Sequence, residues 1–531
     1  MKINSFSLHK LNIYSNFFKI FFLLLFFYIL HIIWSKNIPI ADIESYYWDW
    51  SRDLSMSYHD HPGAVAWICR LGTFLTNDES NLRFFVPIFS LLTNIFLILS
   101  YCKINKIMAK EIEINKIILI IIFYNIIPVF SIQSFVLMPD FSLLTFLSLN
   151  LFLLLHIIDR IKDKNYLPII STIFLGISAG MGANSKHHML PIIFINLITL
   201  YCSKLLDNHF KKFLIIFSIF FFLTFFPTLY WNINNNYSSF IYQLDHGYGR
   251  SDFSIKNSFL FLIESSVYIT PLFFTYGLKK IFTFSKNKDI SSLEIKLQYL
   301  AIAPLCVLII VFLFASFFDY VAPYWISPVF ILLIPFYIDE IKLSTWHKYY
   351  HVIIACICLI PTVMSFKSFR NYFVHKTNGT VGYKIFFWDT LTKDKLEMLA
   401  NIKLPKSLTF KQIQENGCNN NDSIIASFNW TWTSQLAYHL KDHPLIYNLD
   451  DEKKSFYTFR DDLKNLKNCN IILITNNDKM EDLLHYLEQI KYLKVINIKE
   501  FSTKEEFHNI NIASGKYFHI PKNEEEIIDN Y

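Results

Sequence analysis

The sequence predicts an α-helical polytopic membrane protein of about eleven transmembrane helices, followed by a C-terminal α/β domain outside the membrane. Of its 531 residues, 53% are hydrophobic and only 17% are charged, which is less charge than a soluble protein of this size carries. The apolar residues form unbroken runs of roughly 17 to 22, long enough to cross about 30 Å of hydrocarbon. These runs stop after residue 366, where short strand-like and helix-like segments begin to alternate.

Each apolar run is predicted to form one span. The first run lacks a small-residue cleavage site and is long enough to cross the membrane, so we expect a transmembrane helix there and not a cleaved signal peptide. The spans are expected near residues 17–34, 84–101, 116–133, 141–158, 167–183, 188–205, 213–230, 258–277, 298–317, 325–338 and 350–366.

Lysine and arginine are unevenly distributed among the loops, which predicts an N-terminus inside the cell. The predicted inner loops hold Lys103, Lys106, Lys110, Arg160, Lys162, Lys164, Lys204, Lys211, Lys212, Lys279, Lys280, Lys286, Lys288, Lys296, Lys342 and Lys348. The predicted outer loops hold only Lys36, Arg52, Arg70, Arg83, Lys186, Arg250 and Lys256. Residues 1–366 would thus form the transmembrane domain, with Asp42, Asp140, Lys186 and the loop 231–256 on the outer side.

Residues 367–531 are predicted to form a soluble α/β domain on the outer face. Strand-like stretches lie at 423–428, 444–447, 470–475 and 494–498, and a helical pattern covers Lys479–Ile490. Cys418 and Cys469 lie in this domain, where an oxidising compartment would permit a disulfide. The sequence leaves open whether the two cysteines are close enough to pair.

The first outer loop, residues 35–83, contains an aromatic segment that begins with two carboxylates. Ile43, Tyr46, Tyr47, Trp50 and Leu54 recur at helical spacing, so we expect one apolar face lying in the membrane interface. Tyrosine and tryptophan are favoured at that depth whatever the function. Asp42 and Glu44 stand at the start of this helix, where carboxylates are often simple caps.

The outer ends of other spans carry further charged and imidazole groups. Asp140 follows a proline at the start of the fourth span, and Lys186 ends the fifth. If the helices form a bundle, these groups and His61 would converge at one outer interface. Such a set suits sugar transfer from a lipid phosphate, because a carboxylate orients or deprotonates the acceptor and cations neutralise the departing phosphate. Glu264 is a further candidate within a span, or a hydrogen-bonded structural group.

Three other kinds of site are weighed against this interpretation. His59, Asp60 and His61, with His187 and His188, are zinc-ligand types, but they lack a four-ligand spacing, so no metal or other cofactor is expected. The chain contains no glycine-rich phosphate loop and no large inner loop to hold a soluble nucleotide-sugar. No basic stripe interleaved with aromatic residues indicates nucleic acid.

An ordered set of motifs resembles the bacterial branch of the protein O-mannosyltransferase superfamily, which has the GT-C fold and includes the lipid A aminoarabinose transferases. The similarity covers roughly residues 15–335, and the C-terminal domain fits the family layout more loosely. The matching motifs are Asp42–Arg52, Ser57–Pro62, Val65–Trp67, Arg83, Met138–Asp140, Ser185–Lys186, Pro227–Asn232, Tyr237–Gln243, His246–Gly247, Pro271 and Tyr324–Pro328.

The resemblance implies an inverting transferase that takes a sugar from a polyprenyl-phosphate carrier, without a nucleotide, on the periplasmic side of a bacterial inner membrane. Asp42 would be the acidic group beside the acceptor, supported by Glu44, while Asp140 would shape the same site. Lys186 would hold the carrier phosphate. The other residues implied in substrate binding are His61, Arg83, Tyr46, Tyr47, Asn232, Gln243 and His246.

Two departures from the family pattern concern the substrate. Gly63 stands where the family often has a second proline, and His61 stands where aminoarabinose transferases usually carry lysine. These differences count against an aminoarabinose donor. The expected partners are an undecaprenyl-phosphate-linked sugar, lipid A or another envelope glycan as acceptor, and membrane lipids. A protein hydroxyl as acceptor and a lipid-linked sugar flippase are the alternatives, although a flippase predicts midplane charges and a repeated half that this chain lacks.

Overall fold

The computed structural model divides the chain into two compact units. The first unit comprises residues 1–38 and 54–365, and the second comprises residues 39–53 and 366–531. A short segment of the predicted outer loop therefore belongs to the same unit as the C-terminal part of the chain. The structure describes residues 5–248, 253–284, 292–341, 345–376, 423–427, 430–440, 443–449, 455–460, 470–476, 490–498 and 510–517.

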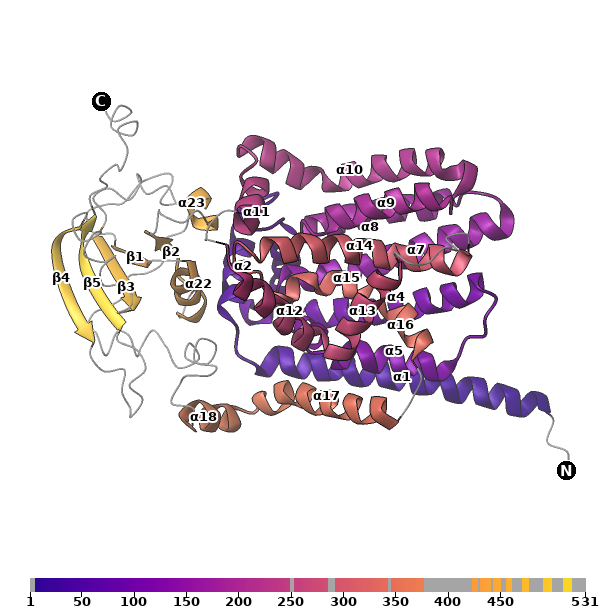
Figure 1. The fold of residues 1–531 in the computed structure, drawn as a ribbon. Helices are drawn as coiled ribbons and strands as arrows, with labels where there is room; N and C mark the ends of the chain where they lie inside the picture. The colour runs from indigo at the N-terminus through magenta and orange to yellow at the C-terminus, as the bar shows by residue number, and fades with distance from the viewer. Residues whose placement is uncertain are drawn as a thin grey trace. The chain divides into compact units, whose positions relative to one another are not determined.

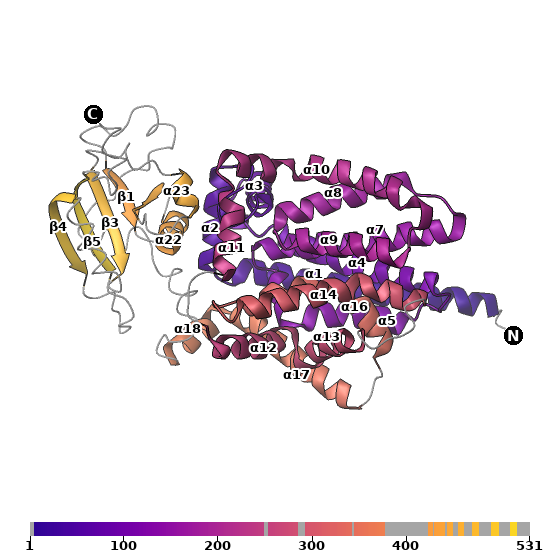
Figure 2. The ribbon, with the colours of Figure 1, turned by 45° about the horizontal axis from the view of Figure 1, so that its top comes forward.

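The first unit is a helical bundle whose long helices run in roughly the same direction (Figures 1 and 2). Among the described residues, five segments are long and apolar enough to cross a membrane, and a bent helix pair makes a sixth. The chain is thus a multi-pass helical membrane protein. Its main helices are α1 (Ser5–Asn37), α3 (Ala64–Thr76), α4 (Val86–Ile107), α5 (Ile114–Ile126), α6 (Pro128–Gln133), α7 (Pro139–Lys164), α8 (Ile169–Ser185), α9 (Met189–Ser203), α10 (Phe210–Asn234), α11 (Ser238–Tyr248), α12 (Ile255–Ile269), α13 (Pro271–Phe284), α14 (Leu293–Ala315), η3 (Pro323–Ile326), α15 (Ser327–Ile331), α16 (Ile334–Glu340) and α17 (Thr345–Met364).

Some predicted spans are interrupted at prolines, which lack an N–H group and disfavour helical geometry in the preceding residue. Helix α5 ends just before Pro128. Helices α12 and α13 meet at an angle of 116°, with Thr270 between them at φ 77° and Pro271 beginning the second helix. Prolines likewise occupy the first position of η3 and the second position of α15 and α16. The helices predicted at 116–133, 258–277 and 325–338 are therefore each broken into shorter helices.

Helices α8 and α10 pack closely because α8 presents glycines four residues apart. A Cβ atom at Gly180 would lie 2.6 Å from Cβ of Thr224, and one at Gly176 would lie 2.7 Å from the carbonyl oxygen of Phe217. Small residues at this spacing let helix backbones approach in lipid, where packing drives association. On α10, a phenylalanine at every fourth position forms a stacked row. This close packing holds α8 against α10, and the predicted site residue Lys186 directly follows the last residue of α8.

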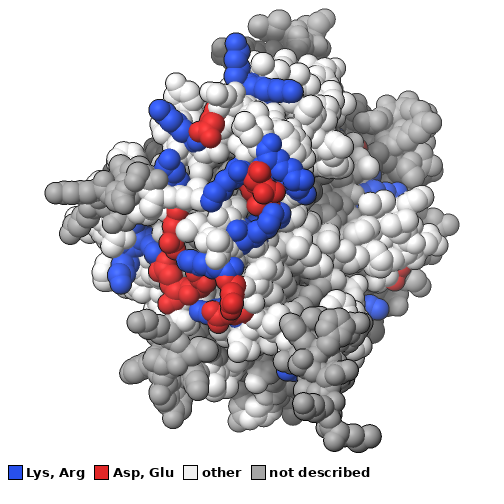
Figure 3. All heavy atoms as spheres, turned by 90° about the vertical axis from the view of Figure 1, so that its right-hand side faces the viewer, with Lys and Arg blue, Asp and Glu red and all other residues white. Residues whose placement is uncertain are grey.

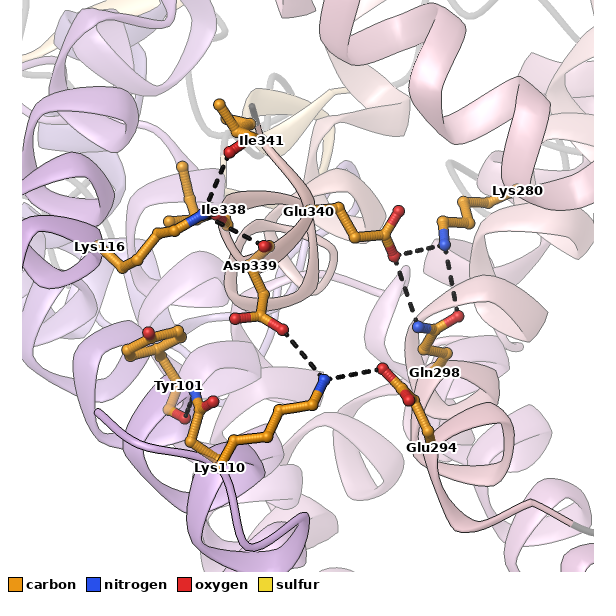
Figure 4. Close-up of polar contacts among 11 residues, drawn as sticks. Tyr101, Lys110, Lys116, Lys280, Glu294, Gln298, Ile338, Asp339, Glu340 and Ile341 are labelled. Carbon is orange, nitrogen blue, oxygen red and sulfur yellow. Dashed lines mark hydrogen bonds and ion pairs between the residues drawn. The ribbon is translucent and has the colours of Figure 1, made fainter. Parts of the chain in front are cut away.

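The end of the first unit at which α1 begins carries lysines interspersed with carboxylates (Figure 3). Lys110 donates to Glu294 at 3.0 Å and to Asp339 at 3.3 Å. Lys116 donates to main-chain carbonyls at the end of α16, and a separate ion pair joins Lys280 to Glu340 (Figure 4). These pairs link the α4–α5 loop, α13, α14 and α16. The loops were predicted to face the cytoplasm, and that orientation remains a prediction.

The second unit contains a five-stranded mixed sheet in the order β2-β1-β3-β5-β4. Strand β1 pairs in parallel with β2 and β3, whereas β5 is antiparallel to both β3 and β4. The strands predicted near 423–428, 444–447, 470–475 and 494–498 are confirmed, and β5 was not predicted. The strands are β1 (Ser423–Ser427), β2 (Ile446–Asn448), β3 (Asn470–Asn476), β4 (Ile490–Ile498) and β5 (Ile510–Tyr517).

Four described helices belong to the second unit: α2 (Asp42–Arg52), α18 (Lys367–Lys376), α22 (Trp430–His439) and α23 (Phe456–Arg460). The predicted helix Lys479–Ile490 falls almost wholly outside the described residues, and so do Cys418 and Cys469. Helix α2 therefore packs with the C-terminal part of the chain, although more than 300 residues separate them in sequence.

Candidate functional site

A buried ion pair joins the start of α7 to the end of α8. Nζ of Lys186 lies 2.9 Å from each carboxylate oxygen of Asp140, and the two side chains are 3% and 2% exposed. Asp140 sits in the first turn of α7, where the positive end of the helix dipole favours a carboxylate. Lys186 follows α8 in extended geometry, which turns its side chain out of the helix path. The structure thus brings together these two predicted site residues.

Tyr324 of η3 completes the surroundings of this lysine. Nζ of Lys186 lies 5.3 Å from the centroid of the Tyr324 ring, within the range of a cation–π contact. Burial raises the pKa of Tyr324 to about 12, and the negative charge of Asp140 acts in the same direction. The phenol therefore stays protonated near neutral pH and remains a hydrogen-bond donor.

Two histidines follow Lys186 in the turn before α9. The ring of His187 shares a hydrogen bond of 2.9 Å with Oγ of Ser239, and burial lowers the pKa of His187 to about 4. The pKa of His188 lies well below its ordinary value, first because the ring is buried and then because Lys186, His61 and His187 oppose its protonation. Both rings are thus neutral near pH 7. The interaction with His61 also indicates that the predicted residue of the first outer loop approaches this turn.

Helix α11 holds the first outer loop next to the same turn. Nε2 of Gln243 donates to the carbonyl of Asp60 at 2.6 Å, and Nδ1 of His59 lies 2.7 Å from Oγ of Ser238. Asn232, at the end of α10, accepts a hydrogen bond of 3.1 Å from the main-chain N–H of Ser239. Gln243 and Asn232 thereby position backbone around the site. His246 belongs to the same helix α11.

Arg83 was predicted to bind substrate, and the structure shows its bonds to the main chain. Its Nη1 atom donates to the carbonyl oxygens of Ser35 at 3.1 Å and Ile38 at 2.7 Å. The guanidinium thus satisfies carbonyls at the end of α1, a common role for a cation at a helix C-terminus. Glu264 accepts a long hydrogen bond from the hydroxyl of Tyr320 at 3.5 Å, close to the distance limit of such bonds.

The predicted residues of α2 lie in the second unit. The carboxylate of Glu44 accepts a hydrogen bond from the N–H of Ala41 at 2.9 Å, as the acidic member of a capping box. Asp42 is the first residue of the helix. Tyr46 packs against Trp430 and Tyr457 with ring centroids 4.8 and 5.8 Å apart.

The aromatic face of α2 therefore packs on protein, and its predicted position in the membrane interface is wrong. Tyr47 and Trp50 on the same helix are 2% and 0% exposed. Their edge-to-face contact, with centroids 4.9 Å apart, continues the aromatic cluster. The helical period was correctly predicted, but period alone does not distinguish a lipid surface from a domain surface.

Three contributors were not predicted as site residues: Tyr324, His188 and Ser239. The first lies in the Tyr324–Pro328 motif, which was noted without a role. His188 directly follows the predicted lysine and was considered only as a metal ligand. Within the part of the chain that the structure describes, no group of three or more His, Cys, Asp or Glu side chains is arranged to hold a metal ion.

Chemically, the surroundings of Lys186 combine a fixed ammonium and its carboxylate partner with neutral hydrogen-bonding groups. Lysine has three N–H donors, and Asp140 engages them from one side only. A cation with a remaining donor and a protonated phenol beside it suit the oxygens of a phosphate. The arrangement is suited to holding an anion and does not itself supply a nucleophile.

The chain resembles known proteins both in sequence and in fold. The family model described as dolichyl-phosphate-mannose-protein mannosyltransferase matches residues 60–231. A crystal structure of ArnT from Cupriavidus metallidurans in the apo state is 13% identical, with a TM-score of 0.58 over 91% of this chain and 96% of that one. The structure of the same protein bound to undecaprenyl phosphate gives 13% identity and a TM-score of 0.59, over 92% and 97%.

No curated protein sequence matches the chain. At 13% identity, the structural likeness establishes the fold. The family match includes Asp140 and Lys186 but ends well before the C-terminal domain. The chain thus has the GT-C membrane fold seen in ArnT, and its residues 60–231 match the mannosyltransferase family model.

Proposed function

We propose that this protein is an inverting membrane glycosyltransferase that takes its sugar from a polyprenyl-phosphate carrier. The observation that carries the proposal is the buried pair of Lys186 and Asp140 beside Tyr324. A buried charge pair contributes little net stability compared with apolar packing, so its presence favours a functional role. The ArnT structure with bound undecaprenyl phosphate supports a carrier of this class.

In the proposed reaction, an acceptor oxygen attacks C1 of the sugar while the bond from C1 to the carrier's phosphate oxygen breaks. The electron pair of that bond leaves with the polyprenyl phosphate. Lys186 stabilises the added negative charge, and Asp140 keeps the ammonium in place. Tyr324 donates a hydrogen bond to the same phosphate. Stabilising charge as it develops is typically the largest single contribution that such a site makes to rate.

Asp42 is proposed to act on the acceptor, a role carried over from the family resemblance. For a hydroxyl acceptor, its carboxylate takes the proton as the new glycosidic bond forms. For a phosphate acceptor, which is already ionised near neutral pH, it orients the acceptor or a cation beside it. Glu44 supports Asp42 by capping the first turn of α2.

An apolar cavity in the first unit is suited to a short part of the carrier's hydrocarbon chain. It lies among α7, α8, α9 and α10 and includes Leu151, Ile193 and Phe217 in its lining. Met189, three residues after Lys186, also lines it. An isoprenoid chain placed here would bury apolar surface while its phosphate stays at the lysine.

The acceptor that we favour is lipid A or another envelope glycan, with a hexose or hexosamine as the transferred sugar, at the periplasmic face of a bacterial inner membrane. The runner-up is a protein hydroxyl, for which the matching family description provides the support. Mass spectra of lipid A from cells with and without the chain separate the two. A lost mass increment supports lipid A, whereas identical spectra exclude it as the acceptor.

The proposed function is tested with purified protein in detergent. Incubation with an undecaprenyl-phosphate-linked sugar and envelope lipid should release undecaprenyl phosphate and yield glycosylated product in equal amounts. Detergent removes the two compartments that a flippase needs, so turnover under these conditions excludes pure transport. The matched variants are Lys186→Met, expected to be inactive, and Lys110→Met, a partly exposed lysine at the other end of the bundle, expected to be active.

A further inference from the structure

Helix α2 is fastened to the C-terminal domain through the carboxylate of Asp49. One oxygen accepts hydrogen bonds from Arg460 at 3.0 Å and from the hydroxyl of Tyr457 at 2.9 Å, and the other accepts from Arg52 at 3.0 Å. The side chains of Asp49 and Arg460 are 0% and 1% exposed. Arg460 also donates to the carbonyl of Ile446 in strand β2 at 2.6 Å. The carboxylate of α2 is thus linked through one guanidinium to the sheet.

Further contacts follow the length of the helix. Oγ of Ser45 donates to Oγ of Ser434 on α22 at 3.0 Å. The hydroxyl of Tyr46 accepts a hydrogen bond from the main-chain N–H of Phe456 at 2.9 Å. Arg52, at the other end of α2, donates to the carbonyl of His443 at 2.8 Å. These contacts involve separate segments of the C-terminal domain, so α2 is fixed against both sliding and rotation.

The energetics favour a permanent attachment. Breaking a buried ion pair leaves an uncompensated charge in a low-dielectric environment, which is strongly unfavourable. On leaving the domain, Asp49 would lose two partners, the hydroxyl of Tyr457 and the cationic Arg460. Its α-carbon lies seven residues, or about 10 Å of helix, from that of Asp42. A helix of this length is stiff, so the anchor at one end also determines the position of the other.

We propose that the C-terminal domain carries α2 as a part of itself, and that Asp49 and Arg460 are positioning residues that present Asp42 for sugar transfer. The proposal rests on the proposed function, because it concerns the same acidic residue. It gives the C-terminal domain a direct part in the reaction, because the acidic residue belongs to that domain.

A cross-link between α2 and α22 tests the attachment in the complete protein. The side chains of Ser45 and Ser434 are close enough that Ser45→Cys with Ser434→Cys should form a disulfide with ordinary geometry. The oxidised double variant should transfer sugar within twofold of its rate after reduction. Activity that is lost on oxidation and restored by reductant would mean that α2 leaves the domain during turnover, which overturns the proposal. Each single cysteine variant, treated with the same oxidant, is the control.

Substitution of the anchor tests the positioning role. Arg460→Gln should lower kcat by about 100-fold, the scale expected for a misplacement of roughly 1 Å, while KM for the carrier-linked sugar stays unchanged. Tyr457→Phe, which keeps the ion pair, should lower kcat much less. Retained binding of undecaprenyl phosphate shows that the first unit is folded. Equal kcat in Arg460→Gln and wild type contradicts the positioning role, whereas a wild-type protein without transfer activity contradicts the proposed function itself.

Discussion

Lys186 and Asp140 form a two-point ion pair, with Nζ of the lysine 2.9 Å from both carboxylate oxygens. The two residues are 46 positions apart in sequence, and each stands at the end of an apolar helix. Both carboxylate oxygens of Asp140 accept a hydrogen bond from the ammonium of Lys186, so the carboxylate determines where the ammonium lies. This relationship connects the fold to the proposed chemistry, because the two helix ends place the ammonium where we propose that the carrier phosphate binds.

The pair should couple strongly in a double-mutant cycle. Lys186→Met leaves a buried carboxylate without its cation and should lower the free energy of unfolding by about 3–5 kcal/mol. Adding Asp140→Leu removes that carboxylate and should recover most of the loss, although both variants lack transfer activity. Denaturant titrations in detergent measure these energies.

The matched control for this cycle is Lys110→Met. That lysine also has carboxylate partners, but its side chain is 41% exposed, so the loss should stay below about 1 kcal/mol. If Lys186→Met and Lys110→Met lowered the free energy of unfolding equally, burial would not explain the energy of the Lys186–Asp140 pair.

Acidification should destabilise the first unit through His187. Burial lowers the pKa of this ring to about 4, whereas the unfolded chain binds the proton near pH 6.5. The unfolded state therefore holds more protons between these values, so stability is complete above about pH 6.5 and falls as the pH decreases toward 4. The full effect is on the order of 3 kcal/mol.

Thermal melting of the purified protein at several pH values measures this loss. His187→Gln can keep a hydrogen bond to Ser239 without titrating, so the slope between pH 6.5 and 4.5 should become shallower in that variant. A variant that loses stability with pH as steeply as wild type would show that other groups cause the loss.

Gly180 should not tolerate even one added methyl group. A Cβ atom there would lie 2.9 Å from the carbonyl oxygen of Phe221 on α10, and backbone gives way only by moving the helix. Gly180→Ala should therefore lower the melting temperature by several degrees, as expected for about 1–3 kcal/mol of overpacking. At Gly182, the three atoms nearest to an added Cβ all belong to the flexible side chain of Met189, at 3.1 Å, so Gly182→Ala should be nearly neutral. Equal melting temperatures for the two variants would contradict this account of the packing.

The predicted orientation places Cys202 on the cytoplasmic side. This exposed cysteine lies near the end of α9, next to the lysine-rich loop that begins at Lys204. In a variant whose only cysteine is Cys202, a membrane-impermeant maleimide should label inside-out vesicles but not intact spheroplasts. Labelling of intact spheroplasts would invert the topology and place the Lys186 site on the cytoplasmic side.

The sequence was sufficient to predict the class of fold, because transmembrane helices depend on local composition. The bend between α12 and α13 was not predicted, because a hydropathy average over Thr270 and Pro271 contains no information about the angle between two helices. Lys186 and Asp140 were predicted to lie close together because each was placed at the end of a predicted span on the same side of the membrane. The attachment of Asp49 to Arg460 was not predictable in this way, because it joins residues 411 positions apart in a domain whose fold depends on non-local pairing.

The most direct test of the central claim is the rate at which purified protein releases undecaprenyl phosphate from its sugar-linked form, compared between wild type and Lys186→Met. We expect turnover by wild type and at least a 100-fold lower rate in the variant. The affinity for undecaprenyl phosphate should drop by about the same factor, since a charge-assisted contact to phosphate is lost. Equal turnover and equal carrier affinity in the two proteins would contradict the assignment of this lysine and, with it, the proposed site.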